Sequence, residues 1–296
     1  MIALNPMPID HEPMPAALAD APIGIFDSGV GGLSVLHDIA RHLPQERFLY
    51  FADTAHVPYG PRDADDIRQL TARAIEWLYR QGCKIAVVAC NSASAFSLDY
   101  LRDYYGERFP IIGLVPALKP AVLQSKTKKV AVLATPATFR GKLIKDVVAG
   151  FAEPAQVEVL AFTCLDLVPY VEADQANSPQ CRETLRQLLD PAVAQGIDYL
   201  VLGCTHYPFL KQSLDLLYGD RLTLIDSGLA VARQTSRILI KHGLLAQVAD
   251  PTRVRIQCVI TGHNVEHLSS VLTHLIPTDL TWSIEHVNIA TADNSE

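Results

Sequence analysis

Short apolar runs alternate with longer amphipathic stretches along most of the chain, and this alternation limits the fold more than any other feature of the sequence. Several of the short runs, such as 86–89, are apolar at every position, as expected of parallel strands that helices cover on both faces. The pattern predicts an α/β fold in which mainly parallel sheets are flanked by helices. The candidate strands are Ile23–Phe26, Phe48–Phe51, Ile85–Ala89, Ile111–Val115, Val130–Ala134, Val157–Phe162, Tyr199–Leu202, Leu222–Ile225 and Val254–Ile260.

Two early segments are echoed later in the chain. Ile25–Gly29 is similar to Leu224–Gly228, and Val87–Asn91 is similar to Val201–Thr205. In the second pair, an apolar strand runs into a cysteine and then into a helical pattern. Open α/β sheets bind ligands at the carboxyl ends of their strands, so two similar lobes would each present one cysteine to a shared cleft. The echoes are short, and chance similarity is the alternative.

The expected crossings between two such lobes are the proline-bearing segment 115–120 and the segment 226–228. The first 21 residues lack helix or strand periodicity and are expected to form an extension. The full expected division is an N-terminal extension at 1–21, a first lobe at 22–117 plus 227–288 that carries Cys90, a second lobe at 118–226 that carries Cys204, and a C-terminal tail at 289–296.

The composition narrows the class of protein. A chain of 296 residues with 49% hydrophobic content can bury one large core or two modest ones. Its formal net charge of −7 gives no general attraction to nucleic acid or to an anionic membrane. No run approaches the roughly 18 apolar residues of a membrane span, and the first 20 residues lack the basic region of a signal peptide. We therefore expect a cytoplasmic protein that binds neither nucleic acid nor membrane.

The cysteines are spread along the chain without a Cys-x-x-Cys pair. In a cytosolic chain of this size they need no disulfide, and any one of them could be a small buried hydrophobe. Cys90 and Cys204 differ from the others because each ends a strand, begins a helical pattern and has polar neighbours. A helix N-terminus is expected to lower the thiol pKa of such a cysteine, and its backbone N–H groups can hold a carboxylate.

Two such thiols across a cleft suit one reaction well. One sulfur removes a proton from a carbon atom, and the other returns a proton to the opposite face. Asp27, at the end of the first strand, is a candidate helper for Cys90, and His206 is a candidate helper for Cys204. Each helper also has a structural alternative, since Asp27–Gly29 could be only a turn and His206 a buried structural histidine.

Other kinds of site match parts of this pattern. The glycine-rich stretch 29–32 follows a strand but lacks the nucleotide-binding motifs, although it can hold a small anion. Cys90, Cys164, Cys204 and His206 could surround zinc, but they lack the close spacing of a structural zinc site. A cysteine hydrolase with His206 as its base leaves the second cysteine unused. A non-catalytic two-lobed binding protein leaves both cysteines unused.

Five motifs follow one another along the chain: Gly24–Val35, Ala52–Gly60, Ala89–Ala95, Leu202–Pro208 and Ile225–Gly228. They closely resemble, in the same order, those of the glutamate racemase family. The resemblance spans about 22–275 and implies a two-lobed α/β enzyme, often dimeric, with its site between the lobes. It implies interconversion of L- and D-glutamate without pyridoxal phosphate, metal or nucleotide cofactor, in order to supply D-glutamate for bacterial peptidoglycan.

The resemblance also implies roles for particular residues. Cys90 and Cys204 match the two proton carriers of the family, and Asp27 and His206 match the groups that assist them. Some members of the family are activated by a cell-wall precursor, for which the extension at 1–21 is a candidate segment. Aspartate, one methylene shorter, is the near alternative substrate. The positions that match substrate-binding residues are Asp27, Ser28, Tyr59, Gly60, Asn91, Ser92, Thr138, Thr205 and His206.

The chain departs from the family pattern at a few positions. Ser92 stands where threonine is common, His56 where arginine is frequent, and Leu165 where proline is common. The hydroxyl survives at Ser92, so anion binding is expected to persist. These differences bear on affinity and on closure of the lobes rather than on the chemistry of the two thiols.

Overall fold

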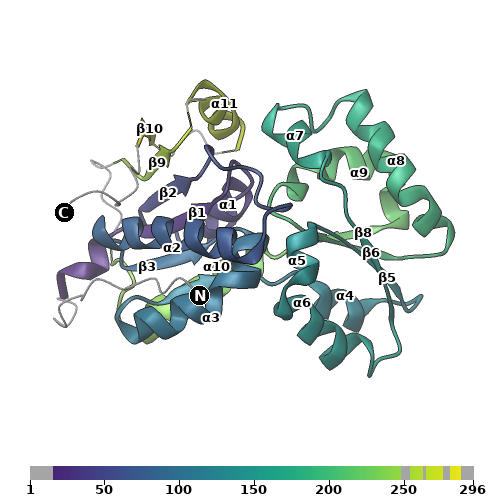
Figure 1. The fold of residues 1–296 in the computed structure, drawn as a ribbon, viewed down its shortest axis with the longest axis horizontal. Coiled ribbons are helices and arrows are strands. Elements are labelled where there is room, and N and C mark those ends of the chain that lie inside the picture. The colour runs from purple at the N-terminus through teal and green to yellow at the C-terminus, as the bar shows by residue number, and fades with distance from the viewer. Residues whose placement is uncertain (1–15, 248–253, 263–264, 276–280, 288–296) are drawn as a thin grey trace.

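A computed structural model of the protein describes residues 16–247, 254–262, 265–275 and 281–287. These residues form two α/β lobes that lie side by side (Figure 1). In the described part of the chain, the first lobe has a six-stranded sheet of order β10-β9-β2-β1-β3-β4 and the second a four-stranded sheet of order β6-β5-β7-β8. Every neighbouring pair of strands is parallel. The predicted α/β fold is therefore confirmed.

All of the expected strands are present, with bounds that shift by a few residues. One further strand, β10, was not expected from the sequence; its half-buried and exposed side chains fit its place at the edge of the sheet. The strands of the first lobe are β1 Ile23–Asp27, β2 Phe48–Ala52, β3 Ile85–Val88, β4 Ile111–Gly113, β9 Ile256–Ile260 and β10 Trp282–His286. Those of the second lobe are β5 Lys129–Ala134, β6 Glu158–Phe162, β7 Tyr199–Gly203 and β8 Thr223–Ile225.

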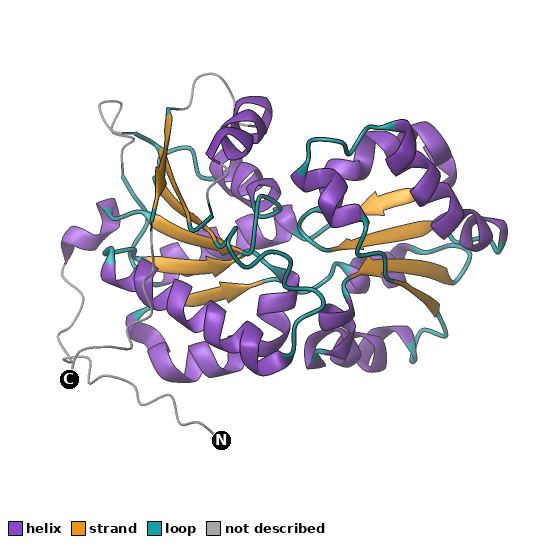
Figure 2. Cartoon of the chain, turned by 45° about the horizontal axis from the view of Figure 1, so that its top comes forward, coloured by secondary structure: helices purple, strands orange, loops and turns teal. Residues whose placement is uncertain are grey.

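Helices cover both faces of each sheet (Figure 2). The helices of the first lobe are α1 Leu33–His42, α2 Ala64–Arg80, α3 Asn91–Tyr105, α10 Gly228–Lys241 and α11 Val265–Leu275. Those of the second lobe are α4 Leu118–Gln124, α5 Pro136–Arg140, α6 Lys142–Val147, α7 Leu167–Glu172, α8 Pro179–Ala194 and α9 Lys211–Tyr218. No helix in the described part of the chain is long and apolar enough to cross a membrane.

Side chains that alternate along the strands build the core. Ile23 and Ile25 of β1 pack in one apolar layer with α1 and α10, whereas Phe26 points to the opposite layer, formed with α2 and α3. The second sheet is built in the same way, with α4 and α6 on one face and α7 to α9 on the other. Because both of their faces are buried, the inner strands β1, β2, β3, β5 and β7 carry apolar residues at nearly every position.

The N-termini of α2 and α8 are capped by residues of the kind that commonly begin helices. The Asp63 carboxylate caps α2 by accepting the N–H of Asp66, and the Ser178 hydroxyl caps α8 by accepting the N–H of Cys181. Pro179 stands in the first turn of α8, where a missing N–H leaves no intrahelical bond unmade.

The chain passes between the two sheets after β4 and again after β8. The Ser227 hydroxyl of the second crossing donates to the Val115 carbonyl of the first, at 2.7 Å. At the amino terminus, residues 16–20 form a short 3-10 helix, and the Lys84 ammonium donates to the Ala19 carbonyl. The rest of the expected extension, 1–15, and the expected tail at 289–296 lie outside the described residues.

Candidate active site

A small cavity lies where the carboxyl ends of β1, β3, β5 and β7 meet between the lobes. The empty space among its lining atoms is about 330 Å³, a figure that includes space open to solvent. It receives side chains from both lobes, including both cysteines singled out in the sequence. The lining residues are Ser28, Pro58, Tyr59, Gly60, Cys90, Asn91, Ser92, Thr135, Leu165, Val168, Cys204, Thr205 and His206.

Cys90 enters the cavity from the first lobe as the N-cap residue of α3. Its sulfur lies 3.8 Å from the Ser28 hydroxyl. Burial raises the pKa of the Cys90 thiol well above its usual value, and the Asp27 carboxylate raises it further, whereas hydrogen bonds from the Ala93 N–H and from Ser28 lower it. The backbone N–H at the start of α3 lowers this pKa, as expected, but loss of solvation outweighs it, so the net pKa of the Cys90 thiol is raised. In this state the thiol keeps its proton.

Cys204 enters the cavity from the second lobe, directly after β7. It lies next to a hydrogen-bonded pair of side chains, His206 and Glu172. Its sulfur lies 3.8 Å from Nδ1 of His206, whose Nε2 lies 2.6 Å from a carboxylate oxygen of Glu172. Burial lowers the pKa of His206, but the hydrogen bonds and charges of Cys204 and Glu172 outweigh it and raise the pKa well above its usual value. The imidazolium that results places a positive charge next to the Cys204 sulfur.

Asp27 lies behind the cavity wall and is fully buried. One carboxylate oxygen accepts the Gly32 N–H at 2.7 Å, and the other lies 3.5 Å from the Thr205 hydroxyl. Burial raises the pKa of Asp27 to about 6, although the His206 charge and the Gly32 N–H oppose this. Asp27 was expected to assist Cys90, and its charge does act on that thiol. Its hydrogen bonds in this structure, however, run to Gly32 and Thr205.

The glycine-rich stretch 29–32 makes a close contact between the lobes. A Cβ atom on Gly31 would lie 2.4 Å from Nδ1 of His206, so no side chain fits there. The N–H of Val30 donates to Glu172 at 3.0 Å. This stretch thus packs against His206, the residue that lies beside Cys204. The close packing explains the glycines, so no bound nucleotide is needed to explain them.

Two polar residues of the site, Thr135 and Glu172, were missed in the sequence. Thr135 follows β5 and its hydroxyl lies 2.8 Å from that of Ser92, so it joins the lobes inside the cavity. Thr138, expected to face substrate, is buried behind it and is absent from the lining, with its hydroxyl 3.0 Å from that of Thr135. The pair Thr135–Pro136 carries the signal of a helix start, which could have marked Thr135. Glu172 ends α7, and no local pattern marks it.

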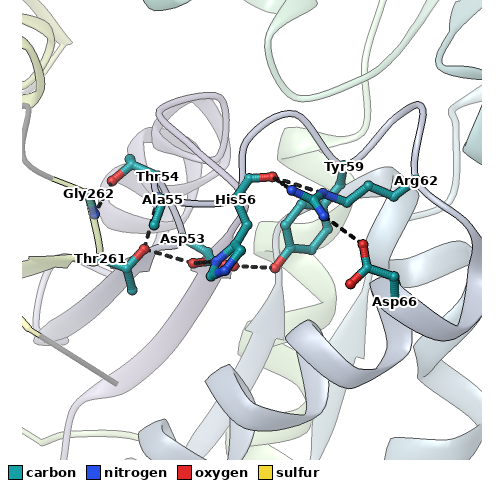
Figure 3. Close-up of polar contacts among 9 residues, drawn as sticks. All are labelled: Asp53, Thr54, Ala55, His56, Tyr59, Arg62, Asp66, Thr261 and Gly262. Carbon is teal, nitrogen blue, oxygen red and sulfur yellow. Dashed lines mark hydrogen bonds and ion pairs between the residues drawn. The ribbon is translucent and has the colours of Figure 1, made fainter. Parts of the chain in front are cut away.

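The turn that carries Tyr59 and Gly60 borders the cavity and is held from both sides. The Tyr59 hydroxyl donates to the Asp53 carboxylate at 2.6 Å (Figure 3). From the other lobe, the Ala137 N–H donates to the Gly60 carbonyl at 3.2 Å. A Cβ atom on Gly60 would meet Thr135 and Leu165 at 3.0 and 3.1 Å, so glycine allows the lobes to approach.

One buried donor in the cavity lacks a hydrogen-bond partner among the described residues. It is the side-chain amide nitrogen of Asn91, on the first turn of α3. An unmet buried donor is costly, and a carboxylate at this position would satisfy it. By contrast, the four candidate zinc ligands do not gather: Cys164 is absent from the lining, and no cluster that could hold a metal is found in the described ranges.

Comparison with known proteins identifies the fold and the family. A family model described as Asp/Glu/hydantoin racemase matches residues 23–235. The chain belongs to this family. It is 52% identical over 263 residues to a glutamate racemase from Deinococcus radiodurans, with 89% of each chain covered. The resemblance seen in the motifs, and with it the predicted class of enzyme, an amino-acid racemase, is thereby confirmed.

Solved structures of glutamate racemases show the same architecture. A glutamate racemase isoform from Bacillus anthracis aligns with a TM-score of 0.79 at 30% identity, covering 91% of this chain and 98% of that one. The enzyme from Escherichia coli, solved with L-glutamate and the activator UDP-MurNAc-Ala, aligns with a TM-score of 0.77 at 30% identity, covering 90% and 98%.

Proposed function

We propose that this protein interconverts L- and D-glutamate with Cys90 and Cys204 as opposing proton carriers. The observation that carries the proposal is the placement of these two thiols, one from each lobe, in the lining of one small cavity. A racemase must act on both faces of one carbon atom, and two groups on separate lobes can reach both faces. The unpartnered amide of Asn91 adds a place for a carboxylate beside them.

Cys204 acts first as the base. As a thiolate beside the imidazolium of His206, Cys204 takes the α-proton from one face of the substrate as the C–H bond breaks. The electron pair passes from the α-carbon onto the carboxylate. The Cys90 thiol, kept protonated by burial, then gives its proton to the other face. In the reverse direction Cys90 is the base and Cys204 the acid, and Asp27 assists Cys90.

The remaining polar residues of the cavity hold the substrate. The amide of Asn91 and the hydroxyls of Ser92 and Thr205 are placed to bind the carboxylate on which charge develops, and their fixed positions stabilise that charge best where water is excluded. Ser28 and the Tyr59–Gly60 turn bind the rest of the substrate. Thr138 contributes through its contact with Thr135.

Closure of the two lobes is part of the proposed cycle. We assign residues 22–117 with 227–288 to one rigid body and 118–226 to the other. Contacts such as Ser92 with Thr135, and Gly60 with Ala137, cross between these bodies at the cavity and must open for substrate to enter.

The biological setting follows from the same proposal. We place the protein in the bacterial cytoplasm, where it supplies D-glutamate for peptidoglycan and so supports cell-wall formation and cell shape. We expect it to act without pyridoxal phosphate, metal or nucleotide, as a homodimer, with no nucleic acid or membrane partner. A cell-wall precursor such as UDP-MurNAc-Ala is a candidate activator, by analogy with the Escherichia coli relative.

Incubation with D-glutamate in deuterated water tests the proposal. Metal-stripped protein should bring the optical rotation of D-glutamate to zero while deuterium replaces the α-proton in the NMR spectrum. L- and D-aspartate, tested in parallel, should react far more slowly. If aspartate is the better substrate, the chemistry stands and the substrate assignment is wrong. If no amino acid loses its α-proton, with or without UDP-MurNAc-Ala, the proposal fails.

Glu172→Gln is expected to narrow the pH range of activity on the alkaline side. The Glu172 charge raises the pKa of His206, so neutralising it lets the imidazolium lose its proton at a lower pH. Activity that needs the imidazolium should then decline about one to two pH units earlier, since a neighbouring opposite charge shifts a pKa by about that much. The kcat/KM profile between pH 6 and 10 measures this. Glu183→Gln, on the exposed face of α8, should leave the profile unchanged, and an unshifted profile for Glu172→Gln contradicts the proposed role.

A further inference from the structure

The buried carboxylate of Asp53 is hydrogen-bonded to the Tyr59–Gly60 turn that borders the cavity. Asp53 follows β2, is almost fully buried, and lies within hydrogen-bond distance of three side chains: the Tyr59 hydroxyl at 2.6 Å, Nδ1 of His56 at 2.8 Å and the Thr261 hydroxyl at 2.7 Å (Figure 3). Of these three partners only Tyr59 lines the cavity. Asp53 therefore links the cavity wall to a residue 208 positions further along the chain.

Thr261 makes several hydrogen bonds to the segment 52–55, which includes Asp53. It follows β9, which is the neighbour of β2 in the sheet. Its hydroxyl donates to Asp53 and accepts the N–H of Ala55 at 3.1 Å, and its own N–H donates to the Ala52 carbonyl. Next to it, the N–H of Gly262 donates to the Thr54 hydroxyl at 2.8 Å. Residues 52–55, at the end of β2 and the start of the loop that follows it, are thus hydrogen-bonded to Thr261 and Gly262 just after β9.

We propose that Thr261 is a positioning residue for the reaction: it orients the Asp53 carboxylate so that Asp53 holds the Tyr59–Gly60 turn in its substrate-binding place. This inference rests on the proposed function. The Thr261 hydroxyl reaches one carboxylate oxygen of Asp53, and the Tyr59 hydroxyl reaches the other. Rotation of the carboxylate without Thr261 would withdraw the acceptor from Tyr59.

The surroundings of Tyr59 agree with a role in holding the turn rather than in proton transfer. Burial and the Asp53 charge raise the pKa of the Tyr59 hydroxyl far above its usual value, so it stays a donor. Its ring packs 6.1 Å from that of Phe26, between centroids. The turn affects the reaction through the place of its backbone at Gly60 and of the Tyr59 side chain in the cavity wall.

The far end of the turn has separate supports. The Arg62 guanidinium donates twice to the His56 carbonyl, at 3.0 and 2.7 Å, and once to Asp66 (Figure 3). Loss of the Thr261 hydroxyl should therefore loosen the turn without releasing it. Because the turn carries no group that transfers a proton in the proposed reaction, the expected effect falls on KM more than on kcat.

Kinetics of Thr261→Val, Thr261→Ser and Thr71→Val with D-glutamate test this. Valine keeps the shape of threonine and removes the hydroxyl, so Thr261→Val should raise KM about tenfold, the order expected for one lost hydrogen bond to a charged group, with kcat within about twofold. Thr261→Ser should restore KM. Thr71→Val is the matched control, because Thr71 is buried in α2 of the same lobe and its hydroxyl bonds only within the helix; its KM should equal that of wild type.

A double-mutant cycle with Asp53→Asn keeps the test decisive if Thr261→Val proves poorly folded. Asp53→Asn should also raise KM, and adding Thr261→Ala, which also removes the hydroxyl, should then change it little, because both residues act through one carboxylate. An unchanged KM for Thr261→Val, a serine variant that fails to restore it, or strictly additive effects overturns the inference. Wild-type protein that fails to racemise glutamate overturns the proposed function instead.

Discussion

Cys90→Ser and Cys204→Ser are each expected to lower the rate of glutamate racemisation by about 10²–10⁴-fold, the usual contribution of a positioned acid or base. Serine keeps the size of the side chain and a hydroxyl, but its hydroxyl ionises far less readily than a thiol. Both cysteines are almost fully buried in the cavity lining, so neither substitution opens the site to solvent. One intact thiol does not suffice, because one sulfur reaches only one face of the α-carbon.

The rate is measured in both directions by circular dichroism of L- and D-glutamate. Cys164→Ser is the matched control, because Cys164 is half-buried near the same lobe contact but lies outside the cavity lining. It should retain nearly full activity. A Cys90 or Cys204 serine variant that keeps more than a tenth of the wild-type rate contradicts the two-thiol mechanism, and equal losses in all three variants point to general damage instead.

The parts of the site that lie at strand ends were predictable from the sequence. Cys90 and Cys204 follow all-apolar runs, and parallel strands bring such ends to one edge of a sheet. Thr135 obeys the same rule directly after β5, where Thr135 and Pro136 begin a helix. Glu172 follows no such rule: it ends a short helix, and tertiary packing of α7 against the 29–32 stretch and against residues 207–210 brings it to His206.

The strands of the fold could be predicted where burial of both faces requires apolar residues along the whole strand. The strands buried on both faces show as apolar runs, whereas β10, half-buried at the edge, carries Glu285 and His286 and shows no such run. The same limit applies to the net pKa of the Cys90 thiol. The sequence shows a helix start beside a thiol, but it does not show how completely the closed lobes exclude water from that thiol, and loss of solvation decides its pKa.

The buried ion pair between Lys84 and Glu46 provides the largest expected effect on stability. Both side chains are within 1% of full burial, far from the cavity and at the opposite end of the sheet. The Lys84 ammonium also donates to the Ala19 carbonyl, and Glu46 accepts the N–H of Ala246. Through these hydrogen bonds the pair attaches the segment before β1 and the segment after α10 to the first lobe. Removing one partner leaves the other as a buried charge without its counterion.

Lys84→Met is expected to lower the free energy of unfolding by about 3–5 kcal/mol, the usual cost of breaking a buried pair. For a chain of this size the midpoint of thermal unfolding should fall by roughly 10 °C. The double variant Lys84→Met with Glu46→Leu should recover most of this loss, because it buries no charge. Arg68→Met is the control: Arg68 pairs with Asp65 at the surface, where a pair contributes about 0–1 kcal/mol.

Racemase activity of Lys84→Met, assayed well below its unfolding temperature, should remain near that of wild type because the pair does not reach the cavity. If the double variant is no more stable than Lys84→Met alone, the loss comes from poor packing of methionine rather than from the stranded Glu46 charge. If Lys84→Met costs no more than Arg68→Met, the pair contributes as little as a surface pair, and the attachment of residues 16–20 must depend on other contacts, such as that of Arg47 with the Asp20 carbonyl.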